Sequence, residues 1–187
     1  MPNGVVLRKN AYVGHTVIQV PVPRLELLVR RHVIAANPGV SLPDDMTACA
    51  HITLLGPFVD RHDINAQLLT TLEELLAPVR GFTFELSRVD RFPSGLNYLT
   101  PNPTEPFKRL TEILAAAFPD WPPYGGAFDD VVPHLSIGEN LTEMEVDSLH
   151  EQLPIVATAE QVTLTWWSHD TISTIATFPL LQREDPS

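Results

Sequence analysis

The sequence predicts an α+β fold in which two sheet lobes meet and helices lie outside them. Short apolar or alternating segments, typical of strands, are interspersed with segments of helical periodicity, in the order β-α-β-α-β-β-α-β-α-β-β. Each half of this order contains a strand, a helix and a strand that carries a His-x-(Thr/Ser) tetrapeptide, at residues 51 and 134. This order suits an α+β domain and shows no short tandem repeat.

Each element follows from its own pattern. Strands are expected where apolar residues alternate or run continuously between turn residues, at 15–21, 48–58, 82–89, 97–100, 131–138, 155–168 and 171–180. The last two of these should pair across the turn at 168–171. Helices are expected where apolar residues recur every three or four positions, at 24–36, 63–77, 104–118 and 142–153. Asp63 is a candidate N-cap, and Thr142 with Glu145 matches a capping box.

Length and composition are those of one domain. The chain has 187 residues, of which 44% are apolar, which is enough to bury one core. We therefore expect one domain over 1–187, with a structured part at about 12–181. The 18 prolines are scattered and separate the elements, so they do not form a linker. A single cysteine, Cys49, excludes an intrachain disulfide and a cysteine-based zinc site; with no signal-peptide or membrane-span pattern, a cytoplasmic location is expected.

The two tetrapeptides are His51-Ile-Thr53-Leu and His134-Leu-Ser136-Ile. Side chains two positions apart in a strand point to the same face. Each strand should therefore bury its two aliphatic residues and present an imidazole beside a hydroxyl. Either motif alone could be a half-buried histidine with a purely structural role, but two copies in equivalent places favour a shared site.

Two imidazoles and two hydroxyls around one ligand suit phosphoryl transfer. A neutral imidazole can take a proton from an attacking water, and an imidazolium can give one to the departing ribose oxygen. Thr53 and Ser136 can donate hydrogen bonds to the non-bridging phosphate oxygens, where negative charge accumulates. His51 and His134 are the predicted catalytic pair, and this chemistry needs no metal or other cofactor.

Longer segments around both motifs resemble the 2H phosphoesterase superfamily, in particular its 2′-5′ RNA ligase-like branch. These segments are 51–58 (HITLLGPF), 122–137 (PPYGGAFDDVVPHLSI) and 91–101 (RFPSGLNYLTP). The similarity spans roughly 12–181. It implies a bilobal, pseudo-twofold fold with two antiparallel sheets lining a central cleft. It also implies metal-independent action on cyclic phosphates or 2′,5′-linked, RNA-related substrates, with His51 and His134 as the catalytic pair and Thr53 and Ser136 binding phosphate.

Other side chains could complete such a site. Arg91, just past a strand end, is the chosen cation for the phosphate, although most surface arginines are simply solvated. Aromatic side chains could stack a nucleobase. The selected candidates are Tyr124, Phe128 and Trp167, and Tyr98 and Trp166 are weaker candidates. The remaining histidines are expected to have structural or surface roles because none has a metal-binding spacing. The alternative functions are a metal-dependent hydrolase and a binding module on the same fold without turnover.

The charge of the chain restricts its partners. The formal net charge is −11 and the pI about 4.9, so a long nucleic acid would be repelled. A small nucleotide or the phosphate end of an RNA remains possible, because a pocket can differ in potential from the surface around it. We expect such a small phosphate-bearing substrate as the partner, no membrane partner and a monomer.

Overall fold

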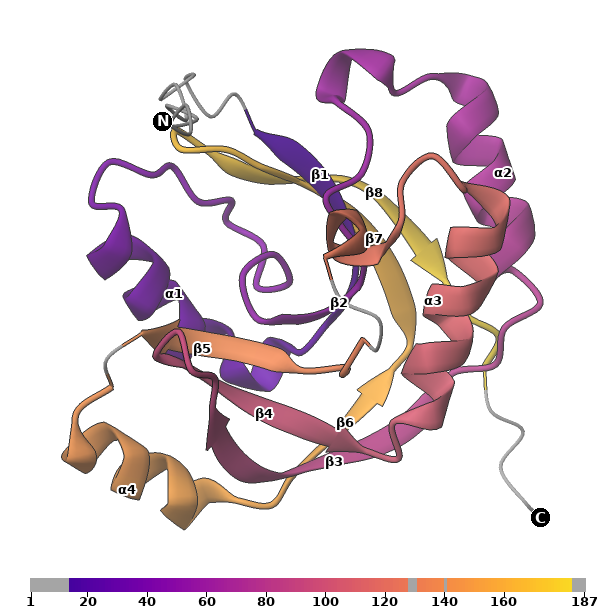
Figure 1. Ribbon diagram of the computed structural model, residues 1–187. Coiled ribbons are helices and arrows are strands. Elements are labelled where there is room, and N and C mark those ends of the chain that lie inside the picture. The colour runs from indigo at the N-terminus through magenta and orange to yellow at the C-terminus, as the bar shows by residue number, and fades with distance from the viewer. Residues whose placement is uncertain (1–13, 128–130, 140, 183–187) are drawn as a thin grey trace, which may run out of the picture.

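The computed structural model of the protein describes residues 14–127, 131–139 and 141–182. These residues form strands and α-helices in an α+β arrangement, as predicted (Figure 1). The strands are β1 (His15–Pro21), β2 (His51–Leu55), β3 (Phe82–Arg91), β4 (Leu96–Asn102), β5 (Leu135–Glu139), β6 (Ile155–Ala159), β7 (Gln161–Trp167) and β8 (Ile172–Pro179). The α-helices are α1 (Glu26–Ala36), α2 (Ala66–Leu76), α3 (Glu105–Ala117) and α4 (Glu143–Gln152). Short 3-10 helices are η1 (Pro23–Leu25), η2 (Arg61–Asp63) and η3 (Pro123–Gly126).

All eight strands belong to one antiparallel sheet, in the order β6-β3-β4-β5-β2-β1-β7-β8. The two expected sheets are therefore the two halves of one continuous sheet. The halves are joined by β2 and β5, whose register contains the single pair Ile52 and Leu135. The two central strands thus contain the motifs: β2 begins at His51, and β5 begins at Leu135, one residue after His134.

Helices α1 and α3 each pack against a strand in the opposite half of the sheet. Helix α1, which follows β1, packs against β5, whereas α3, which follows β4, packs against β2 (Figure 1). The segment β1-α1-β2-α2 in one half thus has a counterpart, β4-α3-β5-α4, in the other. Each motif strand is consequently supported by a helix from the opposite half of the chain order.

One predicted element is wrong: the single strand expected at 155–168 is two strands. Glu160 separates them, and its carbonyl accepts a hydrogen bond from the Leu180 amide at 2.8 Å. Strand β6 pairs with β3 at one edge of the sheet, whereas β7 pairs with β1 and β8 in the other half. The apolar pattern runs through this break because both strands bury side chains, so it gave no sign that the chain changes partners. The predicted pairing of the last two strands is confirmed for β7 and β8.

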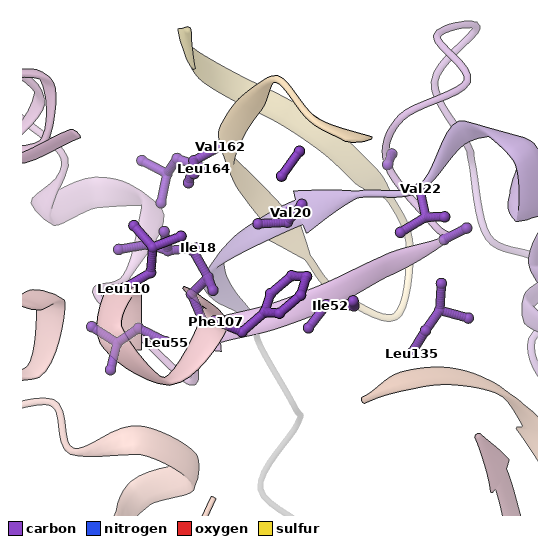
Figure 2. Packing of buried hydrophobic residues seen from close by; sticks show 14 of the residues in the cluster. Ile18, Val20, Val22, Ile52, Leu55, Phe107, Leu110, Leu135, Val162 and Leu164 are labelled. Carbon is purple, nitrogen blue, oxygen red and sulfur yellow. The ribbon is translucent and has the colours of Figure 1, made fainter. Parts of the chain in front are cut away.

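Aliphatic side chains of the motif strands are buried as the alternation predicts. Ile52 and Leu135 are both 0% exposed. Figure 2 shows Phe107 and Leu110 of α3 in the same cluster as residues of β1, β2 and β7. Burial of this face leaves the opposite side chains of β2 and β5 available for a site.

Helix ends partly follow the predictions. The Thr142–Glu145 capping box is confirmed at the start of α4. Asp63 is not the cap of α2: Asn65 accepts the Leu68 amide hydrogen bond at 3.0 Å, and Asp60 caps the preceding η2 instead. A short 3-10 turn absorbs the residues that were expected to begin the helix. None of the described helices has the length and apolar character needed to cross a membrane.

The contact between the halves gives a test of stability. Ile52→Ala should lower the free energy of unfolding by about 2–5 kcal/mol, because it leaves a cavity where β2 meets β5. The control Ile34→Ala changes a side chain that is 47% exposed and should shift the value by no more than about 0.5 kcal/mol. Urea unfolding followed by circular dichroism measures both. Equal effects of the two substitutions would show that the junction is not a buried core position.

Candidate active site

The register between β2 and β5 brings the two motifs together. With Ile52 opposite Leu135 in an antiparallel pair, His51 lies across from Ser136, and Thr53 lies across from His134. Because Ile52 and Leu135 point to the core, these four side chains share the other face of the sheet. The two imidazoles and the two hydroxyls therefore alternate in one small patch.

Both imidazoles are fixed in the same way. The Nδ1 atom of His51 lies 2.8 Å from the carbonyl oxygen of Cys49, and the Nδ1 atom of His134 lies 2.8 Å from that of Val132. A carbonyl oxygen can only accept a hydrogen bond, so each Nδ1 must carry the hydrogen. The Nε2 atom is then the nitrogen of each ring that can take up and release a proton.

A cleft of about 640 Å³ opens beside this patch. Its lining includes His51, Thr53 and Ser136, together with side chains of α1 and the Trp167 ring. The Trp167 ring centroid is 5.1 Å from that of His51, and its indole N–H donates to Gln19 Oε1 at 3.3 Å. Trp166, its neighbour in β7, is only 6% exposed and belongs to the core. The volume is in the range of sites that bury a small ligand.

Aromatic rings surround His134. The ring centroids of Phe92, Tyr98 and Tyr124 lie 5.0, 5.5 and 6.1 Å from that of His134. Phe92 also stacks on Tyr98, with centroids 3.9 Å apart. The rings come from the β3–β4 turn, from β4 and from η3, so they restrict the imidazole from three elements. Phe92 was not among the sequence candidates, because its proximity to His134 depends on the pairing of β4 with β5.

Tyr124 is held in an unusual backbone conformation. Its φ of 52° is in the left-handed region, which non-glycine residues seldom adopt. Its amide donates to the Gly56 carbonyl at 2.7 Å, which ties η3 to the end of β2. Burial raises the pKa of Tyr124 to about 12, partly offset by a side-chain hydrogen bond with Thr53. Strain of this kind persists where the surrounding contacts enforce it, and it is frequent at functional sites.

A buried carboxylate supports the His51 side of the site. Glu26 is 0% exposed, and it accepts the amides of Cys49 and Ala50 at 3.0 and 2.7 Å. Its charge is balanced by Arg30, whose Nε lies 2.9 Å away. Glu26 thus fixes the peptide whose carbonyl holds the His51 ring. Nothing in the periodicity of α1 marked this residue, because its partners lie 23 and 24 positions away in the chain.

Both imidazoles are pushed towards the neutral form. Burial lowers the pKa of His51 to about 4, against weaker raising effects from the Cys49 hydrogen bond and the Glu26 charge. Burial also lowers the pKa of His134 and that of His15. His134 itself lowers the pKa of His51, which is an electrostatic effect between two nearby groups. His15 and His32, given no role from the sequence, both line the cleft.

The other predicted residues lie in different places. Arg91 is exposed, its Nε donates to the Gly95 carbonyl at 3.2 Å in the β3–β4 turn, and it is not among the residues that line the cleft. Phe128 lies outside the described residues. Within the described ranges, no group of three histidine, cysteine or acidic side chains could hold a metal ion.

A family model of the 2′-5′ RNA ligase superfamily matches residues 46–171. The chain belongs to this superfamily. The match covers both histidine motifs and more than half of the sequence. No curated protein matches the chain significantly by sequence.

Solved structures share the fold at low sequence identity. Escherichia coli LigT complexed with phosphate has a TM-score of 0.54 and 14% identity, covering 92% of this chain and 100% of its own. TT0787 of Thermus thermophilus has a TM-score of 0.58 and 17% identity, covering 90% and 99% respectively. E. coli LigT complexed with 3′-AMP has a TM-score of 0.53 and 15% identity, and the match covers 90% of this chain and 99% of that chain. The family and the fold together indicate a 2H phosphoesterase or ligase-like protein.

The lowered pKa of His51 predicts how stability depends on pH. Between pH 6.5 and about 4, the unfolded chain binds a proton at this histidine and the folded chain does not. The free energy of unfolding should therefore fall as the pH is lowered through this window, by at most about 1.4 kcal/mol per pH unit for this one group. Urea unfolding at several pH values should show a shallower fall for His51→Gln. The exposed His62→Gln control should keep the wild-type slope; an unchanged slope in His51→Gln would contradict the burial effect.

The role of Glu26 can be tested by truncation. Glu26→Ala leaves two buried amides without an acceptor, each costing about 1–3 kcal/mol, so stability should fall by at least about 2 kcal/mol. Glu74→Ala removes an exposed carboxylate from α2 and should change stability by no more than about 0.5 kcal/mol. Chemical denaturation compares the two variants. A loss in Glu26→Ala as small as in the control would mean that the carboxylate does not hold the peptide.

Proposed function

We propose that this protein is a metal-independent phosphodiesterase that acts on 2′,3′-cyclic phosphates or on small 2′,5′-linked, RNA-related substrates. The observation that carries the proposal is the alternation of His51, Thr53, His134 and Ser136 across the β2–β5 junction. The Nδ1 atom of each imidazole is hydrogen-bonded to a backbone carbonyl two residues earlier in the chain. Both Nε2 atoms therefore remain available for proton exchange. A site that only bound a ligand would have no need of two such nitrogens.

The reaction then needs two proton transfers. One histidine, neutral at Nε2, removes a proton from water as the water oxygen attacks phosphorus. The bond between phosphorus and one ribose oxygen breaks, and the second histidine, protonated at Nε2, donates its proton to that oxygen. Each transfer contributes about 10²–10⁴-fold to the rate. The bonds and protons in this hydrolysis balance without a redox partner or a metal.

The negative charge of the substrate can stabilise the protonated form that the second histidine needs. Burial disfavours the imidazolium in the free protein, whereas an anionic phosphate beside the ring favours it. Binding and protonation are therefore coupled. Thr53, Ser136 and the phenol of Tyr124, which is bonded to Thr53, are the neutral donors within reach of the non-bridging oxygens.

The fold relatives are consistent with this substrate class. E. coli LigT was crystallised with phosphate and with 3′-AMP. Opening of an adenosine 2′,3′-cyclic phosphate gives a 2′- or a 3′-phosphate, so 3′-AMP belongs to the chemical class of the products proposed here. Trp167 beside His51, and Tyr124 beside His134, are the proposed stacking partners of the base.

Turnover in excess EDTA tests the proposal. Wild type should open nucleoside 2′,3′-cyclic phosphates, and His51→Ala and His134→Ala should each lower kcat/KM by at least about 10²-fold, since each removes one proton transfer. Thr53→Ala and Ser136→Ala should be slower by about tenfold or more, because each removes a hydrogen-bond donor to the phosphate. His62→Ala, at an exposed position in η2, is the control and should match wild type.

Two outcomes would replace the proposal. Turnover that EDTA abolishes and added zinc or manganese restores would favour a metal-dependent hydrolase. Binding of the cyclic nucleotides by wild type without any turnover would favour a module that binds nucleotides or RNA ends.

A further inference from the structure

The walls of the cleft are uncharged over most of their extent. Beyond the motif residues, the lining is largely aliphatic and includes Val17, Val29, Val33, Ala36 and Leu96. Its ionisable groups are three histidines, the buried Cys49 and the carboxylate of Glu139. None of the described residues that line the cleft is an arginine or a lysine. This composition is unusual for a site that would hold several phosphates, since arginine and lysine are the usual partners of phosphate.

Most described basic side chains are engaged or located elsewhere. Five arginines bind partners that are not among the lining residues: Arg24 with the Val156 carbonyl, Arg30 with Glu26, Arg31 with Glu145, Arg88 with Asp90, and Arg91 with the Gly95 carbonyl. Three more basic residues line a separate groove between α2 and α3: Arg80, Lys108 and Arg109. Arg61 lies in the exposed η2 turn. None of these cationic side chains of the described ranges is therefore among the residues that line the catalytic cleft.

Two of the three histidines that line the cleft do not replace the missing cations before a substrate binds: burial lowers the pKa of His15 and His51 and favours their neutral forms. Burial has the same effect on the pKa of His134. The third lining histidine, His32, has its Nε2 atom 3.8 Å from the Glu145 carboxylate. One proton can be taken up when a phosphate binds, and it balances one negative charge. A second anionic group on the ligand would lie among aliphatic side chains with Glu139 as the charged neighbour, where like charges repel and desolvation is costly.

We propose that the cleft selects substrates with a single negative charge, namely a cyclic phosphate on an otherwise uncharged body, and discriminates against the same body when it carries another phosphate. This inference rests on the proposed function and narrows it from RNA-related substrates in general to cyclic mononucleotides without a 5′-phosphate and comparable small esters. Discrimination of this kind comes from an unpaired charge on the competing ligand and needs no additional contact to the preferred one.

A substrate pair that differs in one phosphate tests the inference. Wild-type kcat/KM would be measured for adenosine 2′,3′-cyclic phosphate, for its 5′-phosphorylated form, and for a dinucleotide that ends in a 2′,3′-cyclic phosphate. The first should be preferred over each of the others by at least about tenfold, and the preference should shrink as salt is added. Equal values for the three would overturn the inference and leave the proposed function standing. Loss of turnover for all three would instead count against the proposed function.

A positive charge introduced into the lining of the cleft tests whether the discrimination is electrostatic or steric. Ala35 lines the cleft from an exposed position near the end of α1, so a lysine can be placed there without disturbing the core. Ala35→Lys should raise the ratio of kcat/KM for the 5′-phosphorylated over the unphosphorylated substrate several-fold. Ala116→Lys, exposed on α3 and outside the cleft lining, is the matched control and should leave the ratio unchanged. An unchanged ratio in Ala35→Lys would show that the discrimination is steric and would overturn the charge argument.

Discussion

The short antiparallel contact between β2 and β5 joins the two halves of the sheet, and the position of every catalytic candidate depends on it. One register pair, Ile52 with Leu135, buries an aliphatic side chain from each strand. The same register sets His51 beside Ser136 and Thr53 beside His134 on the opposite face. A shift by one residue would turn the histidines into the core and the aliphatic residues into the cleft, so packing energy and site geometry select the same register.

The support around the two histidines is symmetric in one respect and asymmetric in another. Each ring donates from Nδ1 to the carbonyl two residues before it, which follows from the common strand geometry of the two motifs. Beyond that, His51 is backed by the buried Glu26 through the Cys49–Ala50 backbone, whereas His134 is enclosed by the rings of Phe92, Tyr98 and Tyr124. Burial lowers the pKa of both histidines, and the Glu26 charge opposes this effect at His51. The two halves therefore give their histidines different electrostatic surroundings.

Sequence alone was sufficient for the features that depend on neighbours in the chain. The strand alternation of the His-x-(Thr/Ser) motifs, the four helices and the Thr142–Glu145 capping box all arise within a few residues, and the structure contains each of them. The alternation also indicated that one of the two adjacent tryptophans, Trp166 or Trp167, faces away from the core, but it did not decide which one. The structure buries Trp166 and places Trp167 in the cleft.

Features that depend on distant partners were not predictable in this way. The break at Glu160 sends β6 and β7 to different halves of the sheet without interrupting the apolar pattern. Glu26, His15 and Phe92 reach the site only through packing of elements that are far apart in sequence. Arg91 had the right charge near a strand end, yet the β3–β4 turn holds it at an exposed position.

The most direct test of the central claim is whether one phosphate contacts both imidazoles. Nitrogen-15 NMR of the histidine side chains, recorded during a titration with 3′-AMP, follows each Nε2 separately. The account predicts that His51 and His134 are both protonated at Nδ1 in the free protein, and that both Nε2 signals shift with the same concentration dependence. A shift of only one of the two rings, or of neither while 3′-AMP binds, would contradict it.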